Sequence, residues 1–181
     1  MKIVISSGHA KHVPGAGELI QEVPEARRVV DRVAEYVLDL GDEAIVFHDD
    51  TSKSQSANLN AIVAFHNFQA RDLDVSIHFN CAGDKPVDRA IGTECCYKTQ
   101  ENLAAKVSEA IAQAGGFIDR GAKLRNDLAF LNGTTEPAIL IEVCFVDSRA
   151  DVQLYQEHFA QICAAIAATI TGKPIAKPPI A

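Results

Sequence analysis

Three residues stand at points of the sequence where their side chains could perform metal or acid–base chemistry. His9 follows a short β-branched run at residues 2–5, and His78 lies near the end of a second strand-like segment at residues 73–79. Glu142 interrupts the most apolar segment of the chain, where burial of an unpaired carboxylate is costly. Two histidines and a carboxylate around an open fourth position make a catalytic zinc site, beside which a further carboxylate can act as a general base.

Spacing alone leaves other interpretations open, because no compact HExxH motif is present and the candidate ligands are scattered. His78 could be a core histidine that bonds a backbone carbonyl, and Glu142 could pair with a buried arginine. Asn80 shares a strand face with His78 and could orient a ligand, contact substrate or form a turn. Cys81 is a weaker candidate ligand. Three further histidines are expected at the surface or in capping positions: His12, His48 and His66.

The periodicity of apolar residues predicts strands that alternate with helices. Strands are expected at residues 2–5, 43–48, 73–79, 91–97, 128–131 and 138–146, and helices at 24–38, 56–70, 100–114 and 150–170, the last with a possible break near Glu157. The helix at 56–70 is expected to pack through Leu59, Ile62, Val63, Phe65 and Phe68. This alternation predicts an α/β fold, a three-layer sandwich with a mainly parallel, mixed sheet of about six strands flanked by helices.

Composition narrows the class of protein and its partners. A chain of 181 residues with 48% hydrophobic residues is long enough for one domain with a sizeable core. Its net charge of −7 argues against nucleic acid and anionic membrane surfaces as partners. The apolar stretch near residues 162–170 is too short to span a bilayer, so no membrane insertion is expected.

The cysteines indicate free thiols rather than a disulfide framework. Their number is odd, no CxxC pair occurs, and several lie in apolar runs. This pattern is typical of a protein made in a reducing compartment. The five residues are Cys81, Cys95, Cys96, Cys144 and Cys163.

Several segments together resemble one enzyme family. In chain order they are ISSGHA, QEVPEARRVV, DVSIHFNCAG, IGTECCY, RGAKLRNDLAFLN and PAILIEVCFVD. They resemble the zinc-dependent N-acetylmuramoyl-L-alanine amidases, a family that includes phage endolysin catalytic domains and bacterial cell-wall amidases. The resemblance spans roughly residues 2–170, and its strongest elements are the Gly-His after the first strand, the SIHxN strand end and the late P-A-x-L-x-E strand.

The resemblance implies a role for each candidate residue. His9, Glu22 and His78 would be the zinc ligands, and Glu142 would be the catalytic acid/base. The reaction would be attack of zinc-activated water on the amide between N-acetylmuramic acid and L-Ala of peptidoglycan. Many family members carry an acid and a proline where this chain has Ser6 and Ser7, a difference that bears on the surroundings of His9 rather than on the ligand itself.

The glutamate ligand is the least determined of these assignments. Glu18, Glu22 and Glu25 all lie near the first loop or the start of the first helix. Glu22 is favoured because it precedes the helix start expected at Pro24, where the family's ligand lies. Glu25 is the main rival, and its other role would be a favourable interaction with the helix dipole.

The expected organisation is a zinc amidase catalytic domain at residues 1–172, followed by a Pro-rich tail or linker at 173–181. No signal peptide is evident, so we expect synthesis in the cytoplasm and action on the cell wall after release, as in an endolysin. Two alternatives remain: a zinc peptidase that acts on peptidoglycan peptides, and a non-catalytic cell-wall binding protein of the same fold.

Overall fold

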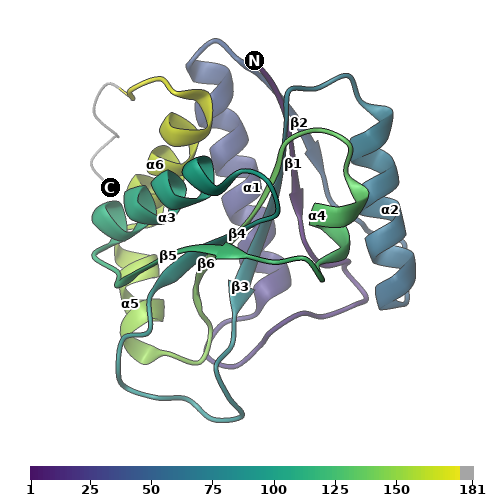
Figure 1. Cartoon of the computed structure of the whole chain (residues 1–181). Helices are drawn as coiled ribbons and strands as arrows, with labels where there is room; N and C mark the ends of the chain where they lie inside the picture. Colours follow the sequence, from purple (N-terminus) through teal and green to yellow (C-terminus); the bar gives the residue numbers. More distant parts are fainter. Residues whose placement is uncertain (176–181) are drawn as a thin grey trace.

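Six strands form one sheet in the computed structural model, which describes residues 1–175 (Figure 1). The strand order is β2-β1-β3-β6-β4-β5. The strands are β1 (Lys2–Ser7), β2 (Glu43–Phe47), β3 (Leu73–Asn80), β4 (Thr93–Tyr97), β5 (Asp119–Leu124) and β6 (Ala138–Phe145). The helices are α1 (Glu22–Asp39), α2 (Gln55–Phe68), α3 (Glu101–Gly115), α4 (Ala129–Gly133), α5 (Arg149–Glu157) and α6 (Phe159–Thr171).

The strand directions bring the candidate site residues to one edge of the sheet. β1 pairs in parallel with β2 and β3, β3 pairs in parallel with β6, and β4 runs antiparallel to β6. The carboxyl ends of β1, β3 and β6 therefore meet at the same edge, where ligands of open α/β sheets collect. The predicted mainly parallel, mixed sheet is confirmed.

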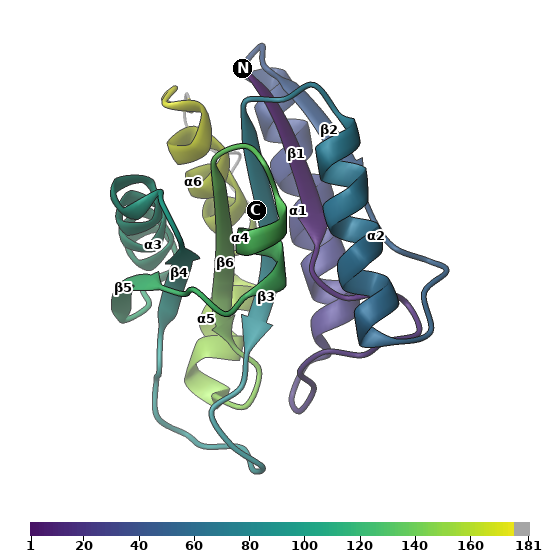
Figure 2. The same cartoon turned by 45° about the vertical axis from the view of Figure 1, so that its right-hand side comes forward.

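Helices cover both faces of the sheet, as the predicted sandwich requires (Figures 1 and 2). α1, α3, α5 and α6 pack on one face over the larger core, to which α1 contributes Val29 and Val33 and the sheet contributes Ile77 and Ile141. α2 and α4 cover the other face over a smaller core. A sheet buried on both faces explains why β6 is an almost continuous apolar run.

Segment 117–137 differs from its prediction. The expected strand at residues 128–131 is wrong: residues 129–133 form the short helix α4, and the edge strand β5 lies earlier in the segment. Phe130 and Leu131 of α4 are buried because this helix packs on β6 and α2. The expected break in the last helix is confirmed, since His158 separates α5 from α6. Of the expected tail at 173–181, residues 176–181 lie outside the described part.

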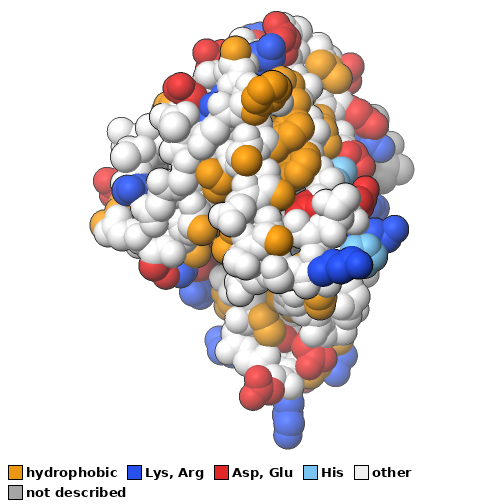
Figure 3. Space-filling model, turned by 90° about the vertical axis from the view of Figure 1, so that its right-hand side faces the viewer, with side chains coloured by type: hydrophobic (Ala, Val, Ile, Leu, Met, Phe, Trp, Pro, Cys, Tyr) orange, Lys and Arg blue, Asp and Glu red, His pale blue; other side chains and the backbone are white. Residues whose placement is uncertain are grey.

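Helix α2 buries Ile62 as predicted, but the rest of its buried face differs from the prediction. Its buried residues are Asn58, Ile62 and His66, four residues apart, whereas Phe68 is 87% exposed. The prediction that His66 is a surface or capping residue is wrong, because its side chain is fully buried. Of the other predicted packing residues, Leu59, Val63 and Phe65 are half-buried, and only Phe68 faces solvent. Figure 3 shows hydrophobic side chains gathered on this side of the molecule.

The five cysteines are free, and all but Cys81 are buried, as predicted. In the described part of the chain, no helix combines the length and apolar character needed to cross a bilayer.

The burial pattern of α2 predicts a contrast between two substitutions. Ile62→Ala removes a side chain that is 2% exposed and should cost about 2–5 kcal/mol in the free energy of unfolding. Phe68→Ala, although it removes more atoms, should change that free energy by only about 0.5 kcal/mol, since the ring faces solvent. Urea unfolding monitored by circular dichroism measures both. Equal losses would contradict this orientation of α2.

Candidate metal centre and active site

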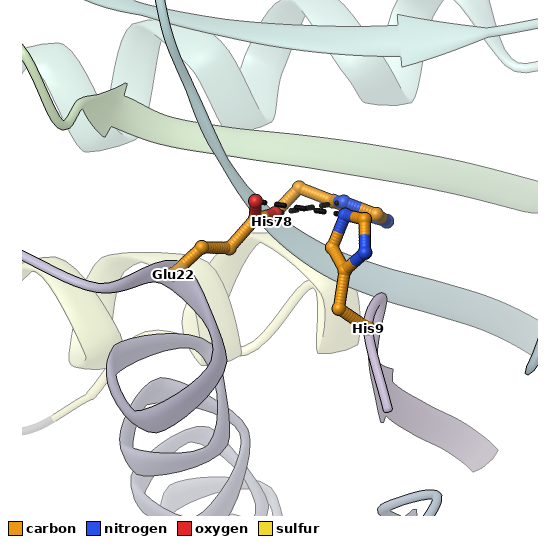
Figure 4. A group of neighbouring side chains, drawn as sticks. All are labelled: His9, Glu22 and His78. Carbon is orange, nitrogen blue, oxygen red and sulfur yellow. Dashed lines mark hydrogen bonds and ion pairs between the residues drawn. The ribbon is translucent and has the colours of Figure 1, made fainter. Parts of the chain in front are cut away.

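Three residues from separate segments meet at the carboxyl edge of the sheet (Figure 4). His9 follows β1, His78 lies near the end of β3, and Glu22 is the first residue of α1. Each offers a donor atom, and the three atoms lie within 4.8 Å of one another. The Glu22 carboxylate lies between the imidazoles, with Oε1 at 3.0 Å from His78 Nδ1 and Oε2 at 3.5 Å from His9 Nε2.

Two glycines allow this close approach. A Cβ at Gly8 would overlap the imidazole ring of His78, and a Cβ at Gly15 would overlap the Glu22 carboxylate and the ring of His9. The Ser-Ser-Gly-His segment therefore needs glycine before the first histidine for reasons of space. The loop after β1 bends back so that Gly15 lies against the site.

The structure separates the three candidate glutamates. Glu22 is 2% exposed and also accepts hydrogen bonds from the backbone N–H groups of Ala16 (2.6 Å) and Phe79 (3.1 Å). Glu25 instead accepts a hydrogen bond from the Tyr155 hydroxyl at 2.7 Å, and Glu18 is exposed. Glu22 is thus the glutamate beside both histidines, although it lies within α1 and not just before it as expected.

The charges at the cluster depend on one another. Burial opposes ionisation of Glu22, but the hydrogen bond and charge of His78, the charge of His9 and the Phe79 N–H hold its pKa below the usual value. Burial also opposes protonation of His78, yet the hydrogen bond with Glu22 and the charge of Glu142 raise its pKa. The pKa of His9 is lowered, mainly by burial. Glu22 and His78 therefore each favour the charged form of the other.

The residues fit a zinc ion. Two imidazoles and one carboxylate are a donor set found in catalytic zinc sites. Glu22 directs one oxygen toward each histidine. His9 Nδ1 is buried and, within residues 1–175, has no hydrogen-bond partner, so its ring is incompletely satisfied by protein groups alone. The lowered pKa of His9 favours the neutral imidazole that a metal requires.

Glu142 lies beside this cluster and not within it. It is paired in register with His78 on the adjacent strand β6, and the two line one cavity of about 320 Å³ together with His9. Other walls come from α2 and from residues 127–130, including Ile62 and Phe130. Glu142 Oε2 is buried and has no hydrogen-bond partner in the described part of the chain.

The pKa of Glu142 is raised to about 7, first by burial and then by the negative charges of Glu22 and Glu94, while His78 opposes the increase. Glu94 is directly opposite Glu142 on the antiparallel strand β4. A carboxyl group that is half ionised near neutral pH is suited to accept a proton and return it. No arginine pairs with Glu142 among the described residues, so the alternative of a structural ion pair has no partner.

The remaining candidates lie outside the cluster. The amide of Asn80 donates to Glu94 Oε1 at 3.1 Å, and its carbonyl oxygen accepts from the Cys81 N–H, so both ends are engaged within the protein. Its role in substrate binding stays a prediction. Cys81 is exposed, and its thiol bonds the Gly83 carbonyl. The contribution of α2 and of residues 127–130 to the cavity was missed, because their apolar pattern carries no signal beyond packing.

An α/β sandwich that gathers a His–Glu–His cluster and a buried glutamate at the carboxyl edge of its sheet has the arrangement of a metallohydrolase. Comparison with known proteins is more specific. Residues 3–172 match the family model Amidase_3, N-acetylmuramoyl-L-alanine amidase. The chain belongs to this family, as its sequence segments indicated.

Similar proteins agree with this assignment. A Clostridium perfringens protein described as an uncharacterized 38.4 kDa protein is 35% identical over 162 residues, which are 87% of this chain and 46% of the relative. The chain thus spans about half the length of the curated relatives it matches. The catalytic domain of the CD27L endolysin, described as targeting Clostridia difficile, matches with a TM-score of 0.84 at 23% identity, over 97% of this chain and 99% of that one. The CwlD amidase of Clostridioides difficile matches with a TM-score of 0.82 at 21% identity, over 95% and 98%. These structures confirm the fold.

The close contact at Gly8 predicts a selective effect on metal binding. Gly8→Ala introduces a Cβ into the space of the His78 ring, so the ring must move and zinc affinity should fall by at least about tenfold. Gly83→Ala is the matched control, because a Cβ there meets nothing within 4 Å. Competition with a chromogenic zinc indicator measures both affinities. Wild-type affinity in a folded Gly8→Ala variant would contradict the contact.

The raised pKa of Glu142 predicts how the stability of the metal-free protein depends on pH. Its pKa is about 7 in the folded protein, whereas an unperturbed glutamate has a pKa of 4.5. The unfolded chain therefore loses this proton at a lower pH than the folded protein does, so the wild-type protein loses stability as pH rises from about 4.5 to about 7. The Glu142→Gln side chain stays neutral at every pH. Its free energy of unfolding should therefore rise relative to that of the wild type as pH increases from about 5, by up to about 3 kcal/mol above pH about 7. Denaturant unfolding in EDTA at pH about 5 and about 8 tests this. A difference that does not change with pH would contradict the burial of the carboxyl group.

Proposed function

We propose that this protein is a zinc-dependent amidase that hydrolyses the bond between N-acetylmuramic acid and L-Ala in peptidoglycan. The observation that carries the proposal is one cavity that joins His9, His78 and Glu142, with Glu22 between the two histidines. Family membership over residues 3–172 supports the amide bond as the target and residues 1–172 as the catalytic domain. In this proposal His9, Glu22 and His78 hold zinc, and Glu142 is the acid/base.

Each residue has a defined part in the proposed reaction. Zinc held by the cluster would polarise the substrate carbonyl and lower the pKa of water to about 7. The Glu142 carboxylate takes a proton from the attacking water as the new carbon–oxygen bond forms. It then delivers that proton to the nitrogen as the carbon–nitrogen bond breaks. The products are the lactyl carboxylate of the glycan and a stem peptide with a free L-Ala amino group.

The protein also prepares these groups before substrate binds. Glu22 is held by the Ala16 and Phe79 N–H groups, so its carboxylate is fixed between the histidines. Glu142 has no competing hydrogen-bond partner within residues 1–175, which leaves its carboxyl group available to the substrate. Ile62 and Phe130 contribute apolar walls to the same cavity.

An endolysin role is the finer proposal, and the similarity in fold to the CD27L catalytic domain supports it. The substrate would be the cell wall, reached after the protein leaves the cytoplasm. Addition of purified protein to intact cells and to isolated peptidoglycan separates this role from that of an amidase that works only on accessible wall material.

Substitution of the acid/base should separate catalysis from metal binding. Glu142→Gln removes proton transfer, so hydrolysis of purified peptidoglycan should fall by about 10²–10⁴-fold while zinc content stays at one ion per chain. Mass spectrometry of the products should find free L-Ala amino termini and intact lactyl carboxylates. EDTA should abolish activity in the wild-type protein, and zinc should restore it.

Glu25→Gln is the matched control, because it makes the same chemical change at a glutamate bonded to Tyr155 instead of to the cluster. It should retain activity. Full activity in Glu142→Gln would remove Glu142 from the mechanism. Cleavage between amino acids of the stem peptide would favour a zinc peptidase, and a zinc-loaded protein without turnover would favour a binding protein.

A further inference from the structure

Two adjacent serines at the end of β1 bind histidines on different elements, and neither contact belongs to the proposed chemistry. Ser6 and Ser7 are fully buried and directly precede the Gly8–His9 peptide. Successive residues of a strand point to opposite faces of the sheet, so the two hydroxyls are directed to different helical layers. Each meets a histidine that in turn contacts an aspartate.

The first chain of hydrogen bonds joins Ser6, His66 and Asp74. Ser6 Oγ lies 3.0 Å from His66 Nε2 on α2, and His66 Nδ1 lies 2.7 Å from Asp74 Oδ1 on β3. Arg71 donates to both oxygens of Asp74, at 2.7 and 2.8 Å. The order of groups resembles a serine-hydrolase triad. Ser6, His66 and Asp74 are nevertheless at most 1% exposed and none of them lines the cavity, so substrate cannot reach them.

The second chain of hydrogen bonds joins Ser7, His48 and Asp31, on the α1 side of the sheet. Ser7 Oγ lies 3.0 Å from His48 Nδ1 at the end of β2, and His48 Nε2 lies 3.0 Å from Asp31 Oδ1 on α1. The Asp31 side chain is 62% exposed, so this second chain of hydrogen bonds is the more solvated of the two. A solvent-exposed contact of this kind contributes less than a buried one.

A third contact holds the next residue. Asn58 of α2 is 1% exposed and donates from Nδ2 to the Gly8 carbonyl oxygen at 3.0 Å. The Gly8 N–H donates to Ile77 O on β3, also at 3.0 Å. Both backbone groups of Gly8 are therefore bonded, and this is the residue against which the His78 ring packs.

We infer that Ser6, Ser7, Asn58 and the histidines bound to the serines are positioning residues that fix the Ser6–His9 segment and thereby set zinc affinity. The inference rests on the proposed zinc site. It also accounts for the unusual buried stripe of α2, in which Asn58 and His66 flank Ile62. Two polar residues on a buried face reduce packing, and their hydrogen bonds to the end of β1 explain their presence. Outer partners of metal ligands typically change affinity by about 10–100-fold.

The test compares hydroxyl and amide deletions in the full chain. Ser6→Ala and Asn58→Ala should each lower zinc affinity by about tenfold or more. Ser7→Ala should lower it less, because the hydrogen bonds that join Ser7 to His48 and Asp31 are partly exposed to solvent. Ser108→Ala is the matched control: Ser108 is also fully buried and hydrogen-bonded, to Asp119 and the Thr93 carbonyl on the other half of the sheet. Zinc affinity is measured by indicator competition, with folding checked by circular dichroism in EDTA.

A second readout reports on the segment itself. In the metal-free protein, amide hydrogen exchange at Gly8 and His9 should be faster in Ser6→Ala and Asn58→Ala than in Ser108→Ala. A purely structural role would lower thermal stability in all three variants but leave zinc affinity and local exchange equal to wild type, and that result overturns the inference. Ser6→Ala removes only one oxygen atom, so it keeps the test decisive if Asn58→Ala does not fold.

The outcomes also separate this inference from the proposed function. A wild-type protein that binds zinc and cleaves peptidoglycan, with variants that bind zinc equally well, overturns the positioning role alone. A wild-type protein that binds no zinc overturns the metal site and this inference with it.

Discussion

The structure depends on the burial of one carboxylate, that of Glu22, at the edge where three chain segments meet. An ionised carboxylate is stable there because it is hydrogen-bonded to the Ala16 and Phe79 N–H groups and to the His78 imidazole, with His9 close by. These contacts join the first loop, the start of α1 and the end of β3. They also explain the glycines, since Gly8 and Gly15 leave the space into which the histidine rings and the carboxylate fit.

Two carboxyl groups close to this edge have opposite electrostatic environments. Glu22 is surrounded by donors, which hold its pKa below the usual value, whereas Glu142 has burial and neighbouring negative charges, which raise its pKa to about 7. Acids whose surroundings push their pKa values apart typically divide the roles of a site between them. Here the ionised group suits metal binding and the protonatable group suits proton transfer. Parallel pairing of β3 with β6 brings Glu142 level with His78 and keeps the two roles adjacent.

The sequence predicted the parts of the molecule that follow from local pattern. Strand–helix alternation indicated the sandwich. His9, His78 and Glu142 could be named as candidate site residues because each is a titratable residue at the end of, or within, an apolar strand-like segment. The family resemblance already favoured Glu22 over Glu25, and the structure adds a reason that local pattern could not give: Tyr155, which is distant in sequence, donates a hydrogen bond to Glu25. The prediction for α2 was wrong at His66 and Phe68, because Asn58 and His66 are buried through hydrogen bonds to Gly8 and Ser6, which hydrophobic periodicity does not reveal. The short helix α4 was missed because packing against β6 and α2, rather than local propensity, decides its conformation.

In the proposed site, His9, Glu22 and His78 hold one metal ion, and Glu142 stays outside its coordination sphere. This arrangement can be tested by crystallography of the zinc-soaked protein, with anomalous data collected at the zinc edge. We expect a single strong anomalous peak within bonding distance of both histidines and Glu22, with Glu25 still bonded to Tyr155 and the Glu142 carboxyl group facing the open side of the ion. A peak at any other set of ligands, or none between these three residues at saturating zinc, would contradict it.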